Sequence, residues 1–163
     1  MTNHNENQVT VIAETTNSKV IQLADGTFKK QTKYNAYQSR TPQTQAEKIE
    51  LYQVFNDSES NIVTPMKGMI GKDITIAHVF TSPYEAFDEK TGELTNGVTT
   101  TIQDVDGSYY ATSSKAVYFT LMNIMNTFGY PDNENYQPII TEVTGKKLQN
   151  GVQVNLKLKG VIE

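Results

Sequence analysis

The order of strand-like and helix-like segments after Gly71 constrains the fold more than any other feature of this sequence. Alternating apolar and polar residues, separated by two turns that contain glycine, predict three consecutive antiparallel strands. The predicted strands cover residues 72–80, 98–103 and 108–112, and the predicted turns cover residues 88–92 and 104–107. The alternation changes phase near His78, which predicts a bulge or bend in the first strand.

One strong helix is predicted directly after these strands. Its apolar residues recur at spacings of four, three and four, at Val117, Leu121, Ile124 and Phe128. Ser113 or Ser114 can cap its start, and Gly129 followed by Pro131 is typical of a helix end. This helix therefore separates the first three strands from the remainder of the chain.

Two further strands are predicted after the helix, at residues 138–143 and 152–159, with a turn at Asn150-Gly151. In the last strand every second residue is apolar and the residues between are polar. The apolar positions are Val152, Val154, Leu156 and Leu158. Three strands, a helix and two strands is the order of a five-stranded oligonucleotide-binding (OB) barrel. We therefore expect a mainly β, OB-fold-like Greek-key barrel with a helix between strands three and four, and an ordinary α+β sandwich remains the alternative.

The length of 163 residues suits one domain with extensions. We expect residues 1–40 to form a polar and basic N-terminal arm whose first eight residues are frayed, and residues 41–163 to form the OB-fold domain with a short helical extension. The extension is predicted to begin at Thr41 with Pro42, or at Thr44 with Glu47 in a capping box. Its expected apolar stripe consists of Ile49, Tyr52 and Phe55, with Leu51 beside them, and it is expected to end at residues 56–58.

A basic segment with aromatic residues lies in the predicted arm. Residues 26–46 contain no acidic residue, whereas the whole chain has a net charge of −4. Their four cations are Lys29, Lys30, Lys33 and Arg40, and their aromatic residues are Phe28, Tyr34 and Tyr37. Cations attract phosphates, and flat rings stack on unpaired bases, so this segment predicts binding of single-stranded nucleic acid. The alternative is an arm whose aromatic residues dock on the domain.

Further candidate binding residues lie in the predicted domain. Tyr109 and Tyr110 are neighbours in a strand and should point to opposite faces; we expect Tyr109 to fill the interior and Tyr110 to face outward, where it could stack on a base. Lys115 opens the main helix, where a cation opposes the helix dipole and an anion nearby is favoured. Four more lysines are expected beside the same groove, namely Lys146 and Lys147 in the last turn region and Lys157 and Lys159 on the outward side of the last strand.

The sequence lacks the residue sets that catalysis or metal binding requires. It contains no cysteine, and its only histidines are His4 and His78. The carboxylates of residues 104–107 lack the other ligands of a calcium loop, so a simple turn is expected. We expect no enzyme activity, no metal and no cofactor. No apolar run reaches the roughly 20 residues of a membrane span, so no membrane association is expected.

Four short motifs resemble those of a known family. They are residues 45–52, 65–75, 104–115 and 124–129, and the resemblance covers roughly residues 41–161. The sequence resembles the single-stranded DNA-binding proteins of small tailed phages of Gram-positive bacteria that replicate from a protein primer. The resemblance implies a protein that binds and protects single-stranded DNA with little sequence preference during phage DNA replication. It also implies action in the cytoplasm of the bacterial host, with phage replication proteins or further copies of the chain as partners.

A second function remains open on the sequence alone. A β-rich protein-interaction or virion-associated module could use the same tyrosines to contact another protein. Binding to nucleic acid must weaken with salt because counterions are released, whereas an apolar protein contact should not.

Overall fold

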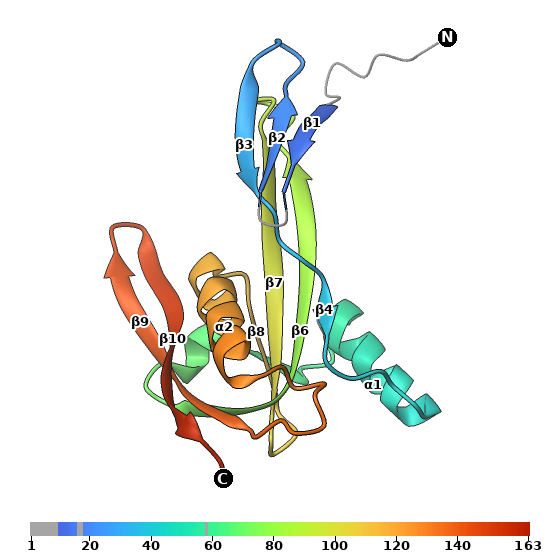
Figure 1. Ribbon diagram of the computed structural model, residues 1–163, viewed down its shortest axis with the longest axis vertical. Helices are drawn as coiled ribbons and strands as arrows, with labels where there is room; N and C mark the ends of the chain where they lie inside the picture. Colours follow the sequence, from blue (N-terminus) through green and yellow to red (C-terminus); the bar gives the residue numbers. More distant parts are fainter. Residues whose placement is uncertain (1–9, 16–17, 58) are drawn as a thin grey trace. The chain divides into compact units, whose positions relative to one another are not determined.

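The computed structural model describes residues 10–15, 18–57 and 59–163 (Figure 1). The predicted frayed residues 1–8 lie outside this described part. The chain divides into two compact units. Unit 1 comprises the chain up to Asn35 together with Pro83–Gly97, and unit 2 comprises Ala36–Ser82 and Val98–Glu163.

The secondary structure consists mainly of strands. The strands are β1 (Thr10–Glu14), β2 (Ser18–Gln22), β3 (Phe28–Thr32), β4 (Tyr37–Gln38), β5 (Val63–Pro65), β6 (Asp73–Phe87), β7 (Leu94–Asp104), β8 (Tyr109–Thr112), β9 (Ile139–Leu148) and β10 (Gly151–Val161). The helices are α1 (Gln45–Asn56), α2 (Lys115–Phe128) and the short 3-10 helix η1 (Met66–Met69).

Unit 1 contains a three-stranded antiparallel sheet in the order β1-β2-β3. Residues 10–32 of the predicted arm therefore contain regular strands. The turn between β2 and β3 needs a left-handed residue, which Gly26 supplies with a φ of 86°. The same unit holds the end of the β6–β7 hairpin, where the Gln31 side chain donates a hydrogen bond to the Leu94 carbonyl oxygen at 3.1 Å.

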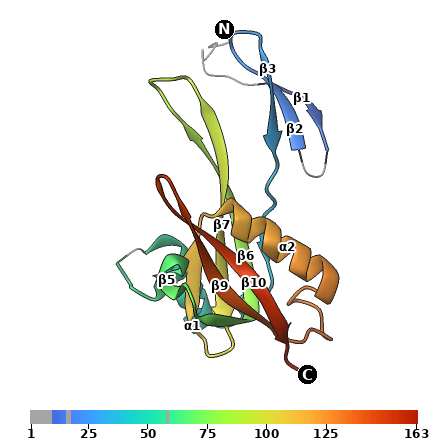
Figure 2. The ribbon, with the colours of Figure 1, turned by 90° about the vertical axis from the view of Figure 1, so that its left-hand side faces the viewer.

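Unit 2 is built on a curled sheet in which the strand order is β10-β9-β6-β7-β8-β5 (Figures 1 and 2). β4 pairs with β6 beside this path, and β6 and β7 continue from unit 2 into unit 1. The expectation of a mainly β structure is confirmed, and a curled sheet with two helices is compatible with an OB-like fold.

The bend predicted near His78 coincides with a change of strand partner. Residues 73–76 of β6 pair with β9, whereas Phe80 and Thr81 pair with β4. The buried positions change accordingly, because Ile74 and Ile76 alternate but Val79, Phe80 and Thr81 are buried in succession. Val79 packs in the main core and Phe80 in the cluster with Leu51 of α1, so both faces of β6 are covered at this point.

The main helix α2 begins and ends as predicted. The Ser114 hydroxyl accepts a hydrogen bond from the Val117 amide at 3.2 Å, and Gly129 ends the helix with a φ of 110°. α2 lies against β10 and packs on the main core (Figure 2). The buried face consists of Val117, Tyr118, Leu121, Ile124 and Met125. Phe128, the last of the four apolar positions in the predicted pattern, is exposed, because the buried face includes Tyr118 and Met125 and ends before the Gly129 cap.

Helix α1 begins in the second of the two predicted registers. The Thr44 hydroxyl accepts a hydrogen bond from the Glu47 amide at 3.1 Å, and the helix ends at Asn56. The predicted apolar stripe is wrong, because Ile49 and Tyr52 are exposed. α1 instead packs through Leu51, with half-buried Val54 beside it, in a cluster that contains Phe80 and Tyr109. The sequence offers two apolar faces on α1, and tertiary packing uses the smaller one.

The acidic turn after β7 has a structural role. The Asp104 carboxylate accepts a hydrogen bond from the Thr75 amide at 2.8 Å, which fastens the turn to β6. Within the described residues, no group of three or more acidic, histidine or cysteine side chains could hold a metal ion. No helix of the described part is long and apolar enough to cross a bilayer.

Candidate nucleic-acid interface

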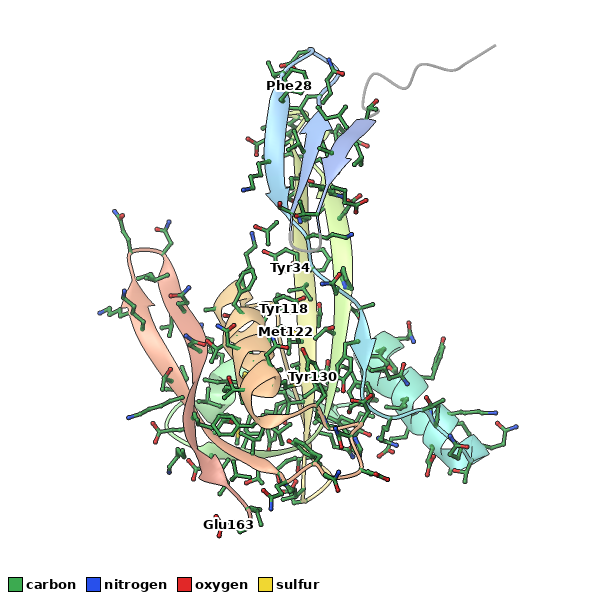
Figure 3. All side chains as sticks on the ribbon, viewed as in Figure 1. Phe28, Tyr34, Tyr118, Met122, Tyr130 and Glu163 are labelled. Carbon is green, nitrogen blue, oxygen red and sulfur yellow. The ribbon has the colours of Figure 1, made fainter. Side chains whose placement is uncertain are left out.

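The basic strand β3 presents cations and one large apolar ring to solvent. Lys29, Lys30 and Phe28 are exposed, and Figure 3 labels Phe28 at the turn end of β3. Because side chains alternate along a strand, Phe28 and Lys30 share one face of the sheet, and Lys29 shares the other with buried Gln31. The cations of the predicted segment are therefore divided between two faces.

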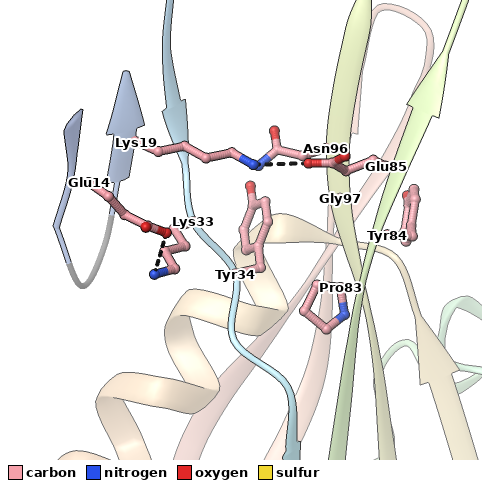
Figure 4. Close-up of a pocket in the computed structure, with 9 residues that line it drawn as sticks. All are labelled: Glu14, Lys19, Lys33, Tyr34, Pro83, Tyr84, Glu85, Asn96 and Gly97. Atoms are coloured by element: carbon pink, nitrogen blue, oxygen red, sulfur yellow. Dashed lines mark hydrogen bonds and ion pairs between the residues drawn. The ribbon is translucent and has the colours of Figure 1, made fainter. Parts of the chain in front are cut away.

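A cavity of about 410 Å³ lies in unit 1 (Figure 4). Its walls come from the three-stranded sheet, from the segment that follows β3 and from the β6–β7 hairpin. The lining residues are Glu14, Lys19, Lys33, Tyr34, Pro83, Tyr84, Glu85, Asn96 and Gly97. Lys33 and Tyr34 of the predicted site are therefore brought together.

Two ion pairs cross this cavity. The Lys33 ammonium lies 2.7 Å from a Glu14 carboxylate oxygen, and the Lys19 ammonium lies 2.9 Å from a Glu85 carboxylate oxygen. The hydrogen bond from Lys33, together with its charge, lowers the pKa of Glu14 below the ordinary value of 4.5. In Figure 4 the Lys19 side chain extends from β2 to Glu85 on β6. Both cations therefore have carboxylate partners in the free protein.

Two tyrosines of the cavity differ in exposure. Only 8% of the Tyr34 surface is exposed, so little of its ring can receive a base. Tyr84 is 45% exposed, and its ring lies over the backbone of Gly97 on the neighbouring strand. A Cβ atom on Gly97 would lie 2.5 Å from Cζ and Oη of Tyr84, so only glycine leaves room for the ring in this position. Tyr84 is therefore the more suitable stacking residue.

Four residues of the cavity were not predicted from the sequence: Lys19, Tyr84, Asn96 and Gly97. The pairing of Tyr84 with Gly97 follows from the register of the β6–β7 turn. In this turn the Asp88 amide donates a hydrogen bond to the Glu93 carbonyl oxygen. Counting back from that turn places Tyr84 opposite Gly97, and an aromatic ring commonly covers a cross-strand glycine. No comparable signal marks Lys19, whose partner Glu85 lies 66 residues away.

In unit 2, Tyr37 and Arg40 make contacts within the protein. The Tyr37 hydroxyl donates a 2.6 Å hydrogen bond to Asp132. The pKa of Tyr37 is raised mainly by burial and also by this hydrogen bond. Arg40 donates to the side chains of Gln103 at 3.1 Å and of Tyr109 at 2.6 Å. Arg40 also lies 3.7 Å from a Glu50 carboxylate oxygen. Both residues thereby fasten the segment before α1 to unit 2.

The expected orientations of Tyr109 and Tyr110, inward and outward respectively, are wrong. Tyr109 is buried, but it lies in the cluster under α1. Tyr110 does not stand outward; it is half-buried and packs against the main core. Their side chains do point to opposite faces of the sheet, but both faces are covered. The main core covers the face with Tyr110, and α1 covers the face with Tyr109.

The remaining predicted lysines are exposed and lie in several places on unit 2. Lys115 is the first residue of α2, and Lys146 and Lys147 lie at the end of β9. The latter two belong to the strand and not to a loop, since they pair with Gln153 and Val152. Lys157 lies opposite Glu142 in the β9–β10 register.

Lys159 lies at an irregularity that the alternation did not predict. The β9–β10 register shifts between Leu158 and Gly160. The Lys159 ammonium lies 3.0 Å from both Asp73 carboxylate oxygens, and this contact raises its pKa. The apolar side of β10 is buried at Val154 and Leu156 but exposed at Val152 and Leu158. The prediction of four core positions is therefore wrong at both ends, where the strand passes the core and the register shifts.

Comparisons with known proteins identify a relative. No known family profile matches the chain, and no solved structure matches it. The single-stranded DNA-binding protein of Bacillus phage GA-1 is 33% identical over 152 residues, which cover 92% of this chain and 89% of that protein. The resemblance found in the sequence motifs is thereby confirmed. The chain belongs to the family of phage single-stranded DNA-binding proteins.

Proposed function

We propose that this protein binds and protects single-stranded DNA with little sequence preference during phage DNA replication. The observation that carries the proposal is the 33% identity, over nearly the whole chain, to a phage protein of that name. The protein would act in the cytoplasm of the bacterial host, where phage replication proteins and further copies of the chain are its expected partners.

The interface that we propose uses lysines for phosphates and exposed rings for bases. Lys29 and Lys30 on β3 support it because both are exposed on a segment free of acidic residues. Lys33 and Tyr84 extend it into the unit 1 cavity, where buried Tyr34 forms part of the wall. On unit 2, Lys146 and Lys147 are separate candidates for phosphate contacts. Lys115, Lys157 and Lys159 are secondary candidates. Tyr37, Arg40, Tyr109 and Tyr110 are assigned a positioning role, because each packs or bonds within unit 2.

We further propose that residues 41–163 contain a five-stranded Greek-key barrel of the OB type, with residues 1–40 as its extension. The strand order β10-β9-β6-β7-β8 supports this, since the strand after α2 lies beside the first strand of the series. In such barrels the second and third strands hold the ligand, together with the loops that join strand one to two and strand four to five. These elements correspond to β7, β8 and the turns of the β6–β7 and β9–β10 hairpins.

The function is tested by titrating the protein with poly-dT at roughly 50 mM and 200 mM salt. Tyrosine fluorescence serves as the signal, because the chain has nine tyrosines and no tryptophan. Binding should weaken steeply with salt. Affinity that does not change with salt, or no binding at the lower salt, would refute the proposal.

A triple alanine variant of Lys29, Lys30 and Lys33 tests the basic segment. It should bind every base composition more weakly and reduce the salt slope by about 2, since each lost single-strand phosphate contact contributes about 0.7. The matched control replaces Lys67, Lys72 and Lys90, which are also exposed. An equal loss in the control would show that only the net charge matters.

A protein-interaction or virion-associated module remains the second candidate. It is favoured by one observation, the exposed Ile49 and Tyr52 on α1. A contact of this apolar kind would persist at high salt, so the same titration separates the two functions.

A further inference from the structure

The two ion pairs of the unit 1 cavity are unequally covered. The Lys19 side chain is 20% exposed, whereas its partner Glu85 is 52% exposed. The Lys33 side chain is 35% exposed, whereas its partner Glu14 is 49% exposed. In each pair the carboxylate is the outer member, so it can turn into water while the ammonium group stays at the cavity wall.

The rest of the cavity suits a nucleotide. Tyr84 offers an exposed ring face, held in place by the Gly97 backbone. The Asn96 side chain donates a hydrogen bond to the Thr32 carbonyl oxygen, which connects the hairpin to β3 within unit 1. The volume of about 410 Å³ is sufficient for a base with its sugar and phosphate.

We propose that this cavity is a binding site for the phosphodiester backbone of single-stranded DNA, in which Glu14 and Glu85 occupy the positions that two phosphates take in the complex. The proposal rests on the proposed function and deepens it. A carboxylate oxygen and a phosphate oxygen are both anionic acceptors for an ammonium group, so each can replace the other on Lys33 and Lys19. DNA binding thus exchanges two internal ion pairs for two external ones.

The exchange has a consequence for affinity. Because DNA must displace both carboxylates, the free protein binds more weakly than its lysines alone would allow. Because exposed ion pairs are weak, displacing the two carboxylates costs little free energy, and the resulting loss of DNA affinity is small. Replacing either glutamate by glutamine keeps the side-chain shape and removes the competing charge.

The experiment measures poly-dT affinity for Glu85→Gln and Glu14→Gln by anisotropy of labelled DNA. Each variant should bind about twofold to fivefold more tightly than the wild type, and the double variant should multiply the two gains. The matched control is Glu93→Gln, which removes the same charge from the same hairpin but does not line the cavity. Its affinity should stay close to that of the wild type.

A mutant cycle with Lys19→Ala separates local exchange from general charge. Lys19→Ala should bind more weakly, and adding Glu85→Gln to it should give no gain, because no ammonium group remains to be released. A gain that persists without Lys19, or an equal gain in Glu93→Gln, would overturn the proposal. Thermal unfolding of each variant verifies that it is folded.

The ion-pair exchange and the proposed function can be refuted separately. If the wild type binds poly-dT but neither glutamine variant binds more tightly, the exchange is wrong and the proposed function stands. If the wild type does not bind poly-dT, the proposed function fails and the exchange fails with it.

Discussion

At the scale of single residues, several groups that suggested DNA binding hold the fold together. Arg40 is the clearest example, because its positive charge is visible in the sequence but its partners are not. Tyr109 lies 69 residues away from it along the chain, and Gln103 lies 63 residues away. A cation held by two side chains from distant segments, and close to Glu50 on the following helix, is a structural residue, and sequence spacing cannot reveal the distant partners.

His78 gives the fold a measurable dependence on pH. Burial, and then the charge of Arg40, lowers its pKa below the ordinary value of 6.5. Its Nδ1 atom lies 3.1 Å from the Ser39 hydroxyl, which also accepts a hydrogen bond from the Val79 amide. As pH falls through 6.5, the unfolded chain takes up this proton before the folded one does, so the free energy of unfolding should decrease.

Urea unfolding at about pH 7.5 and about pH 5.5 tests this dependence, because carboxylates titrate mostly below that window. The wild type should lose more free energy of unfolding over the window than His78→Gln does. Equal losses in the two proteins would show that His78 does not titrate abnormally.

Tyr84 should contribute stacking energy to DNA binding. Tyr84→Leu keeps the apolar bulk but removes the flat ring, so affinity should fall by about 1–3 kcal/mol, and the loss should persist at high salt. Anisotropy of labelled poly-dT measures the change. The matched control is Tyr52→Leu on α1, which removes another exposed ring and should leave affinity unchanged. Normal affinity of Tyr84→Leu would remove this ring from the interface.

At the scale of elements, the packing of α1 provides a direct test of the fold. Leu51 is buried against Phe80 and Tyr109, whereas Ile49 is exposed on the same helix. Leu51→Ala should therefore lower the free energy of unfolding by about 2–4 kcal/mol. Ile49→Ala should change it by less than about 0.5 kcal/mol. Equal costs in denaturant unfolding would mean that α1 packs through its other face.

The β9–β10 hairpin should contribute charge rather than stability. Replacing Lys146 and Lys147 by glutamate places two negative charges at its exposed end, so poly-dT affinity should fall while the melting temperature stays the same. Charge reversal at Lys67 and Lys72 serves as the control. Unchanged affinity in the hairpin variant would exclude this element from the interface.

Helix ends that are set by neighbouring residues could be predicted from the sequence. The distant segments against which the helices and strands pack could not. The caps of α2 at Ser114 and Gly129 depend on neighbouring residues, and both were predicted. The buried face of α1 depends on Phe80 and Tyr109, which lie far away in the chain, so its stripe was assigned to the wrong residues. The cavity of unit 1 was missed for the same reason, because it joins the N-terminal sheet to a hairpin about 60 residues later.

At the scale of the whole molecule, the protein must bind a polyanion although its own net charge is −4. Local charge decides such binding, because interactions between exposed charges are screened beyond about 8–10 Å at physiological salt. The segment at residues 26–46 has a net charge of +4, and the ion pair between Lys33 and Glu14 neutralises part of that charge. We therefore expect moderate, strongly salt-dependent affinity for single-stranded DNA that relies on backbone and ring contacts rather than on base identity.

Binding to oligonucleotides of different composition tests this expectation. Anisotropy titrations compare dT, dA and mixed-sequence oligonucleotides of about 30 nucleotides with a duplex of the same length, all at one salt concentration. We expect dissociation constants within roughly tenfold of one another for the three single strands, and much weaker binding to the duplex. Equal binding to the duplex, or strong preference for one base composition, would contradict it.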